Sequence, residues 1–262
     1  MAIKIAINGA AGKMGKKVIS LAASDERFEI AAALETPNHS LISEDSGIIA
    51  GVGENQIPIT SYANDFDVLI DFSSPEGFLN GLDIALENKA NFVSGTTGLK
   101  SEQFERLRNA SSEIGIFYAA NFSKGIAVLD ILIQKAAELL NDADVEIIES
   151  HHRNKVDSPS GTAMSLANSL AKIKNLDFEK EIIFGRQGNV GPRKDSELCL
   201  HSIRAGGIIG EHKVLFAMPH ENVILEHRAV DRKLFAAGAL DAAEFVHDKL
   251  GLFSMNDLLN SI

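Results

Sequence analysis

Short apolar runs alternate with amphipathic helical patterns along the first half of the chain. Residues 3–7 form an apolar run, a glycine-rich turn follows, and the next helix has Met14, Val18, Leu21 and Ala22 on one face. The same patterns predict strands at 28–34, 67–72, 91–94 and 114–119, and helices at 75–87 and 101–112. This alternation predicts a Rossmann-like, doubly wound parallel sheet. Residues 36–60 have little periodicity, and we expect a long loop there.

The pattern changes in the second half. A helix is predicted at 125–140, a strand at 145–148, and a helix whose buried face carries Ala163, Leu166 and Leu170. Strands without intervening helices are then predicted at 182–184, 197–204, 208–218 and 223–229, before a last helix at 235–249. Short links between consecutive strands favour antiparallel pairing. We therefore expect a second α+β domain with a mixed or antiparallel sheet, and a last helix that returns to the first domain.

Composition and charge narrow the classes of protein that fit. Of 262 residues, 45% are hydrophobic and 23% charged, which is ordinary for a globular protein. The net charge of −11 argues against a nucleic-acid partner. One cysteine excludes an internal disulfide and fits a reducing compartment. Apolar stretches are too short for a membrane span, and residues 1–9 lack a signal peptide's apolar region. We expect a cytoplasmic protein with no membrane partner.

The glycine-rich turn after the first strand has the context of a dinucleotide site. Gly9, Gly12 and Gly15 are followed by a helix and a second strand that ends in Glu35. Backbone N–H groups at the helix start can bind a pyrophosphate, and the acid can accept hydrogen bonds from ribose hydroxyls. The spacing is G-x-x-G-x-x-G rather than G-x-G-x-x-G, so a tight turn without a ligand is the alternative.

Three further segments fall at predicted strand ends, where open parallel sheets bind ligands. They are residues 71–73, 95–98 and 119–122. Each segment alone is compatible with a plain turn. Their shared position predicts a nicotinamide pocket.

The stretch from Glu149 to Thr162 carries the candidate chemistry. It joins a predicted strand to a helix and contains His151, His152 and Lys155. Its Ser-Pro-Ser-Gly-Thr turn offers the N–H groups of a helix N-terminus, which suit a carboxylate or phosphate. We call this N-terminal turn the anion seat, meaning a site that binds a carboxylate or phosphate. An imidazole that can donate a proton beside such a site indicates acid-assisted chemistry on an anionic small molecule.

Other interpretations of this stretch remain open. The adjacent histidines would also suit a hydrogen-bonded pair at a strand end, with Lys155 solvated. They lack the usual spacing of zinc ligands, and Cys199 is remote in sequence, so no metal site is predicted.

With G-A-A-G-K-M-G, G-T-T-G, A-A-N-F-S and E-S-H-H-R-N-K-V-D-S-P-S-G-T in this order, the chain resembles the 4-hydroxy-tetrahydrodipicolinate reductase (dihydrodipicolinate reductase) family over its full length. The resemblance implies reduction of a cyclic dicarboxylate by NADH or NADPH in diaminopimelate and lysine biosynthesis. It implies that His151 is the proton donor and Lys155 the second catalytic residue. Implied substrate contacts are His152, Ser160, Gly161, Thr162 and Thr97. Implied cofactor contacts are Gly9, Ala10, Ala11, Gly12, Lys13, Met14, Glu35, Gly95, Thr96, Thr97, Ala119, Ala120, Asn121 and Phe122.

The resemblance also implies a homotetramer and two domains. Residues 1–122 with 232–262 would bind the dinucleotide, and residues 123–231 would bind substrate and oligomerise. The chain departs from the family in two respects. Members that hold NADPH often have Arg directly after the ribose acid, where this chain has Thr36, and members commonly have Ala before the Pro of the P-S-G-T turn, where this chain has Ser158. Two rival functions remain: another nicotinamide dehydrogenase of the same architecture, and a dinucleotide sensor without turnover. The sensor would have no use for His151 with Lys155.

Overall fold

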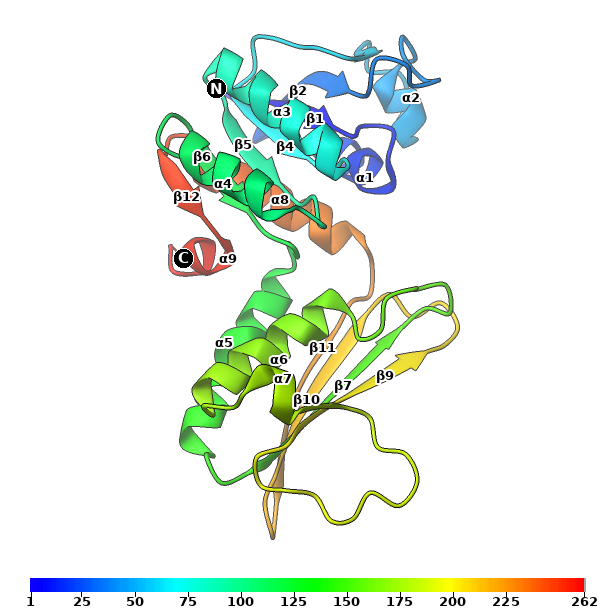
Figure 1. Cartoon of the computed structure of the whole chain (residues 1–262). Helices are drawn as coiled ribbons and strands as arrows, with labels where there is room; N and C mark the ends of the chain where they lie inside the picture. Colours follow the sequence, from blue (N-terminus) through cyan, green and yellow to red (C-terminus); the bar gives the residue numbers. More distant parts are fainter. Residues whose placement is uncertain (262) are drawn as a thin grey trace. The chain divides into compact units, whose positions relative to one another are not determined.

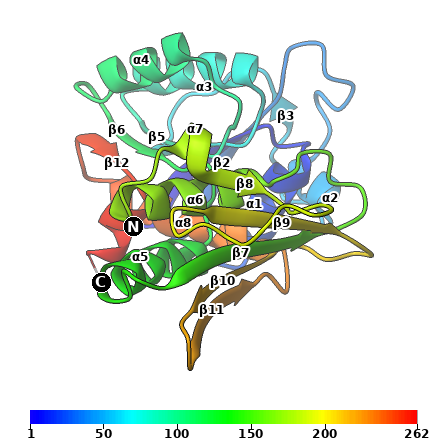
Figure 2. The same cartoon turned by 60° about the horizontal axis from the view of Figure 1, so that its bottom comes forward.

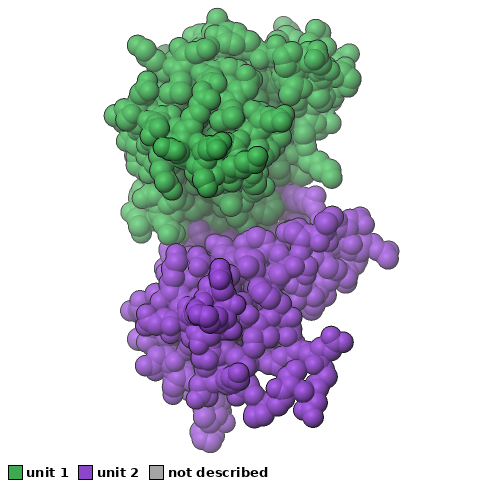
Figure 3. All heavy atoms as spheres, viewed as in Figure 1, with its two compact units in different colours: residues 1–124, 233–262 green, residues 125–232 purple. Residues whose placement is uncertain are grey.

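The computed structural model describes residues 1–261, and the chain divides into two compact units (Figure 3). Unit 1 comprises Met1–Lys124 and the segment that begins at Lys233, and unit 2 comprises Gly125–Arg232. The chain therefore passes between the units twice, after Lys124 and after Arg232.

In the described part of the chain, unit 1 is built on a seven-stranded sheet in the order β12-β6-β5-β4-β1-β2-β3 (Figure 1). Every pair of neighbouring strands is parallel. The strands are β1 (Ile3–Asn8), β2 (Phe28–Leu34), β3 (Ile59–Thr60), β4 (Val68–Asp71), β5 (Asn91–Ser94), β6 (Gly115–Tyr118) and β12 (Gly251–Phe253). The helices are α1 (Lys13–Ala22), α2 (Ser46–Ala50), α3 (Pro75–Asn88), α4 (Ser101–Ala110), α8 (Lys233–Val246) and α9 (Met255–Leu259). The predicted Rossmann-like architecture is confirmed.

The strand order reverses at β1, which lies between β2 and β4. The crevice beyond the carboxyl ends at such a point is where open α/β sheets bind ligands. Asn8 ends β1 and Asp71 ends β4, and both are buried there. The glycine turn after β1 therefore lies where open α/β sheets usually bind ligands.

The C-terminal helix α8 packs on unit 1, against α1 and β5. The Asn91 side-chain amide donates to the carbonyls of Val246 and His247, each at 2.6 Å, and so joins β5 to the end of this helix. Arg27 pairs with Asp241 of α8 at 3.0 Å. Through these contacts α8, which comes from the last part of the chain, packs on the sheet of unit 1.

Among the described residues, unit 2 holds a five-stranded mixed sheet in the order β11-β10-β7-β9-β8 (Figure 2). The strands are β7 (Asp144–His151), β8 (Ile182–Phe184), β9 (Leu198–Arg204), β10 (Glu211–Ala217) and β11 (Asn222–Arg228). The helices are α5 (Lys124–Leu139), α6 (Gly161–Ile173) and α7 (Phe178–Glu181). Apolar residues of α5 and α6 pack with Val145, Ile147, Val214 and Phe216 in one core on one face of the sheet.

The expectation of antiparallel pairing was wrong for β8 and β9, which are parallel, and right for β10 and β11. The link between β8 and β9, residues 185–197, is long enough to return the chain to the same end of the sheet. Strands β9 and β10 are consecutive but not paired, because β7 lies between them. The sequence pattern identified the strands but not their neighbours.

Five short elements were also not predicted. Helix α2 and strand β3 lie inside the segment 36–60, helix α7 lies directly before β8, and β12 and α9 follow the last predicted helix. The three helices have four or five residues, too few for helical periodicity to reveal, and the two strands have only two and three residues. No described helix has both the length and the apolar character needed to cross a bilayer.

Candidate active site

His151 is the last residue of β7, and its imidazole lies against a buried carboxylate two residues earlier. Nδ1 of His151 is 2.5 Å from Oε2 of Glu149. The two side chains share one face of the strand because side chains alternate along it. The Glu149 side chain has no exposed surface, and that of His151 is 12% exposed.

The same carboxylate reaches the start of α6. The backbone N–H of Ser160 donates to Oε1 of Glu149 at 3.2 Å. The Ser160 hydroxyl accepts from the N–H of Ala163 at 3.2 Å and so caps the helix. Gly161 begins α6, and a Cβ placed on it would meet nothing within 4 Å. The N-terminus of a thirteen-residue helix is thus open beside the imidazole.

The remaining residues of the central stretch lie on the loop between β7 and α6. The Lys155 ammonium pairs with Asp157 at 2.8 Å, and its side chain is 21% exposed. The Lys155 N–H donates to the carbonyl of His152, which is itself half-buried. Thr162 is the second residue of α6 and is also half-buried. Two of the predicted substrate contacts, Gly161 and Thr162, are therefore the first two residues of the helix. A third, Ser160, is its buried N-cap residue.

Three residues of this site were missed from the sequence because two lie on other strands and the third lies directly before one. Arg204 of β9 donates to both carboxylate oxygens of Glu149, at 2.9 and 2.7 Å. His212 of β10 stacks edge-on to His151 with ring centroids 5.3 Å apart. Gly210 lies beside His151, and a Cβ there would be 3.1 Å from its Nε2. Alternation along 208–218, with Val214 and Phe216 inward, was the signal that could have found His212.

Burial and hydrogen bonding set the charge states here. Burial raises the pKa of Glu149, but hydrogen bonds from His151, Arg204 and Ser202 outweigh it and hold that pKa well below its ordinary value. Burial, together with the neighbouring His151, lowers the pKa of His212 from 6.5 to about 4. Near neutral pH, therefore, Glu149 is ionised and His212 is neutral.

The glycine turn in unit 1 has the close contacts that exclude side chains. Gly9 has φ of +77°, and a Cβ on it would lie 2.8 Å from the carbonyl oxygen of Phe72. A Cβ on Gly15 would lie 2.2 Å from the carbonyl oxygen of Gly9. Gly12 is the N-cap of α1. The Ala11 N–H donates to Oε1 of Glu35 at 3.0 Å, so the predicted ribose acid also holds the turn.

The other predicted contacts in this turn occupy different depths. Ala10 is fully buried and Ala11 half-buried. Lys13 and Met14 form the first turn of α1, with Lys13 exposed and Met14 half-buried.

A pocket of about 400 Å³ opens over this turn. It is lined by Asn8, Gly9, Gly12, Glu35, Thr36, Pro37, Phe72, Ser73, Ser74, Glu76, Gly77 and Asn80. Two of these described lining residues are carboxylates and none is lysine or arginine. The glycine cradle and the acid fit the adenosine half of a dinucleotide.

A buried carboxylate organises the strand ends beside the pocket. Asp71 accepts hydrogen bonds from the hydroxyls of Ser73 at 2.5 Å, Ser94 at 2.8 Å and Thr96 at 2.8 Å, and from the amide of Asn8 at 2.9 Å. Burial raises the pKa of Asp71, although these hydrogen bonds oppose the shift. The buried side chain of Thr96 is thus committed to this network, which holds β1, β4 and β5 in register.

The segments after β5 and β6 differ in exposure. Gly95 lies against Phe72, where a Cβ would be 2.2 Å from the ring, whereas Thr97 is exposed. Ala119 is buried and Ala120 is exposed. The Asn121 side chain accepts from the N–H of Ser123 at 2.8 Å. The Phe122 ring is buried against those of Phe72 and Phe117.

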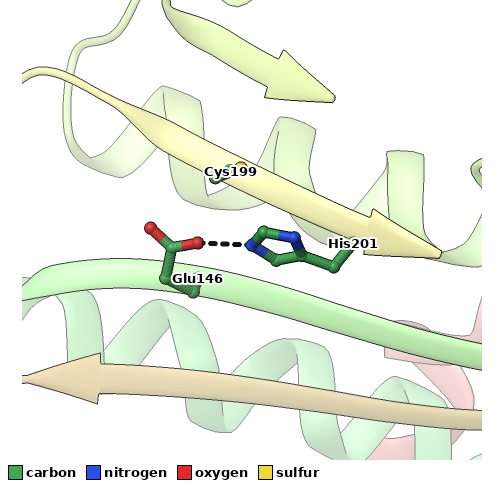
Figure 4. Close-up of side chains that lie close together, drawn as sticks. All are labelled: Glu146, Cys199 and His201. Atoms are coloured by element: carbon green, nitrogen blue, oxygen red, sulfur yellow. Dashed lines mark hydrogen bonds and ion pairs between the residues drawn. The ribbon is translucent and has the colours of Figure 1, made fainter. Parts of the chain in front are cut away.

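On the opposite face of the unit 2 sheet, Glu146, Cys199 and His201 gather ligand-type atoms within 4.8 Å of one another (Figure 4). Arg186 and Arg193 both donate to Glu146, at 3.0 to 3.4 Å, and His201 lies 2.7 Å from it. Burial raises the pKa of the Cys199 thiol. Two guanidinium groups and a protonated thiol disfavour a cation, so we interpret the cluster as an ion-pair network.

Comparison with known proteins agrees with this architecture. The structure is similar to that of dipicolinate-bound dihydrodipicolinate reductase from Paenisporosarcina sp. TG-14, with 24% identity, 98% of this chain and 99% of that chain covered, and a TM-score of 0.76. It is also similar to an amine dehydrogenase from Mycobacterium smegmatis (11% identity, 98% and 96% covered, TM-score 0.60). A third similar structure is GenD2 from gentamicin A biosynthesis in complex with NAD (11% identity, 95% and 86% covered, TM-score 0.61).

Family models give the more specific result. Residues 3–122 match the model of the dihydrodipicolinate reductase N-terminus, and residues 125–259 match that of its C-terminus. The two matches cover nearly the whole chain, in the expected order. The chain therefore belongs to the dihydrodipicolinate reductase family, NAD(P)H-dependent oxidoreductases of diaminopimelate and lysine biosynthesis.

Proposed function

We propose that unit 2 binds the cyclic dicarboxylate and that His151 delivers the proton that completes its reduction to tetrahydrodipicolinate. One observation carries the proposal. The imidazole of His151 and the N-terminus of α6 are joined through a single carboxylate, at 2.5 Å and 3.2 Å. A proton donor and an anion seat are thereby held next to each other.

The anion seat is the first turn of α6. The first N–H groups of a helix lack intrahelical partners and carry partial positive charge, which suits a carboxylate. Gly161 leaves open space over this turn. We assign Gly161, Thr162 and His152 to contact with substrate carboxylates, and Ser160 to shaping the seat as the helix cap.

Lys155 is assigned to charge stabilisation. As hydride reaches the ring, negative charge develops along the conjugated system, and a nearby ammonium stabilises it. Its ion pair with Asp157 holds the ammonium against the loop that follows His151 and His152. An exchange of Asp157 for a substrate carboxylate would leave Lys155 paired throughout, since Asp157 is largely exposed.

Unit 1 is assigned to the dinucleotide. The turn of residues 9–14 and Glu35 would hold its pyrophosphate and adenosine ribose, and the segments 95–97 and 119–122 its nicotinamide half. When bound, NAD(P)H supplies the hydride. Thr97, exposed in the segment that follows β5, is assigned to contact with substrate and cofactor.

We also propose that the protein is a homotetramer built through unit 2 and acts in the cytoplasm. Ile203 and Ile224, on the sheet face away from the helices, are 46% and 53% exposed, and apolar side chains on a sheet face favour burial against another subunit. Light scattering should report the mass of four 28.2 kDa chains. A monomer mass would contradict the assignment.

The dicarboxylate assignment is tested with two planar inhibitors. Pyridine-2,6-dicarboxylate should compete with substrate, as it has the two carboxylates of the substrate ring. Pyridine-2-carboxylate leaves part of the seat unpaired and should bind more weakly by about 1.5–3 kcal/mol, the usual contribution of hydrogen bonds to a charged group. The inhibition constants are to be measured at fixed ionic strength, with Thr162→Val expected to reduce the difference. Equal constants for the two inhibitors would contradict dicarboxylate recognition.

A further inference from the structure

We propose that Glu149 is a positioning residue for the reaction, which holds His151 through Nδ1 and so leaves Nε2 as the atom that delivers the proton. The inference rests on the proposed function of His151 and adds a residue to it. No sequence motif assigned a role to this carboxylate.

The geometry leaves Glu149 little freedom. Its side chain is fully buried on the helix-facing side of β7. Its two oxygens accept from the guanidinium of Arg204 at 2.9 and 2.7 Å, and Oε1 also accepts from the N–H of Ser160. A bidentate guanidinium–carboxylate pair fixes orientation as well as charge. The carboxylate is therefore held in one orientation, and the imidazole 2.5 Å from it is held in place by the same contacts.

Ionisation of Glu149 sets the direction of the bond to His151. An ionised carboxylate can only accept, so Nδ1 carries the hydrogen. The Nε2 proton of the imidazolium is then the one that can pass to the substrate carbon. After the transfer, the neutral ring keeps its proton on Nδ1, where it is hydrogen-bonded to Glu149. The substrate has gained the proton that balances the hydride.

The opposite edge of the ring supports Nε2 as the delivering atom. Gly210, immediately before β10, faces this nitrogen, and a Cβ there would lie 3.1 Å from it. Such a distance is tighter than most contacts of a real Cβ, so a side chain would crowd the ring. Glycine at this position keeps the space beside Nε2 clear.

The same strand supplies a matched control. Glu146 is also a glutamate of β7 that contacts a histidine, His201, at 2.7 Å and an arginine, Arg186, at 3.0 Å. It lies on the other face of the sheet, because it is three positions from Glu149, an odd number, and side chains alternate along a strand. Glu146→Gln removes the same charge from the same strand without touching His151.

Glu149→Gln should lower kcat by about 10²-fold or more, within the roughly 10²–10⁴ range of general acid catalysis, with KM for substrate changed less than about threefold. Dinucleotide affinity, measured by fluorescence, should not change. Glu146→Gln should keep kcat within about twofold of the wild type. Loss of kcat with KM retained separates positioning from general damage, which would affect binding and thermal midpoint as well.

A second readout needs no turnover. A hydrogen shared between an imidazole and a carboxylate at 2.5 Å should give a far-downfield proton resonance in the wild type. The resonance should be absent in Glu149→Gln and in His151→Ala, and present in Glu146→Gln. Its persistence in Glu149→Gln would overturn the proposal.

Gly210→Ala keeps the proposal testable if Glu149→Gln does not fold. It should lower kcat by on the order of 10-fold through displacement of the ring, with the downfield resonance retained. Unchanged kcat in Gly210→Ala would contradict Nε2 as the delivering atom. Normal kcat in Glu149→Gln, with an inactive His151→Ala, would overturn the positioning role and leave the function standing. A wild type without substrate-dependent turnover would instead refute the function itself.

Discussion

At the scale of single residues, His212 makes the stability of unit 2 sensitive to pH. Its imidazole is 4% exposed, its Nε2 lies 3.3 Å from the Ser160 hydroxyl, and its pKa falls from 6.5 to about 4. Between pH 6.5 and 4 the unfolded chain binds a proton at this residue that the folded chain does not. The contribution of His212 to the free energy of unfolding is therefore most favourable above pH 6.5 and falls as the pH drops through this window.

Comparison with His212→Asn isolates this contribution. The difference in free energy of unfolding between wild type and variant, from denaturant titrations, should shrink by about 3 kcal/mol from pH 7 to pH 4. Groups such as Asp71 titrate in both proteins and cancel. Loss of the contact to Ser160 shifts the difference by a constant amount and leaves its slope unchanged. A difference that is independent of pH would contradict the assignment.

We expect two other residues, Glu35 and Thr36, to determine the preference between NADH and NADPH. Both line the pocket over the glycine turn, and a carboxylate there accepts from ribose hydroxyls but repels a 2′-phosphate. We predict that NADH is used at least as well as NADPH, as judged from kcat/KM at matched salt. Thr36→Arg should raise kcat/KM for NADPH and affect NADH little. A tenfold preference of the wild type for NADPH would refute the prediction.

At the scale of elements, the packing of α1 on the turn after β1 depends on Gly15. A Cβ there would lie 2.2 Å from a backbone oxygen that cannot rotate away. Gly15→Ala should therefore displace the helix start, lower the free energy of unfolding by about 1–3 kcal/mol and weaken dinucleotide binding. Gly207→Ala, where a Cβ meets nothing within 4 Å, is the control. Equal dinucleotide affinity in the two variants would show that this close approach is unimportant.

The elements also show where sequence patterns suffice. Parallel strands buried on both faces were predicted from their continuous apolar runs, and helices with one apolar face from a periodicity that extends over many residues. The parallel pairing of β8 with β9 was not, because strand neighbours depend on where a loop such as 185–197 returns the chain. Periodicity identifies the residues that face the core, but it does not identify which strand pairs with which.

At the scale of the whole molecule, the sequence predicted the stretch to which we assign the chemistry but not the residues that surround it. His151, Lys155 and Gly161 are close in sequence and were found together. Arg204 and His212 join them only through pairing of β7 with β9 and β10. A sequence motif reveals functional residues that lie close together in the sequence, such as those of a single loop. The partners that fix those residues come from strands that are remote in sequence, and the fold alone reveals them.

The most direct test of the account is NADH absorbance in the presence of enzymatically generated dihydrodipicolinate precursor. The account predicts oxidation of NADH that depends on the precursor, and a kcat about 10²–10⁴-fold lower for His151→Ala with dinucleotide binding retained. Absence of precursor-dependent oxidation in the wild type, or near-normal kcat in His151→Ala, would contradict it.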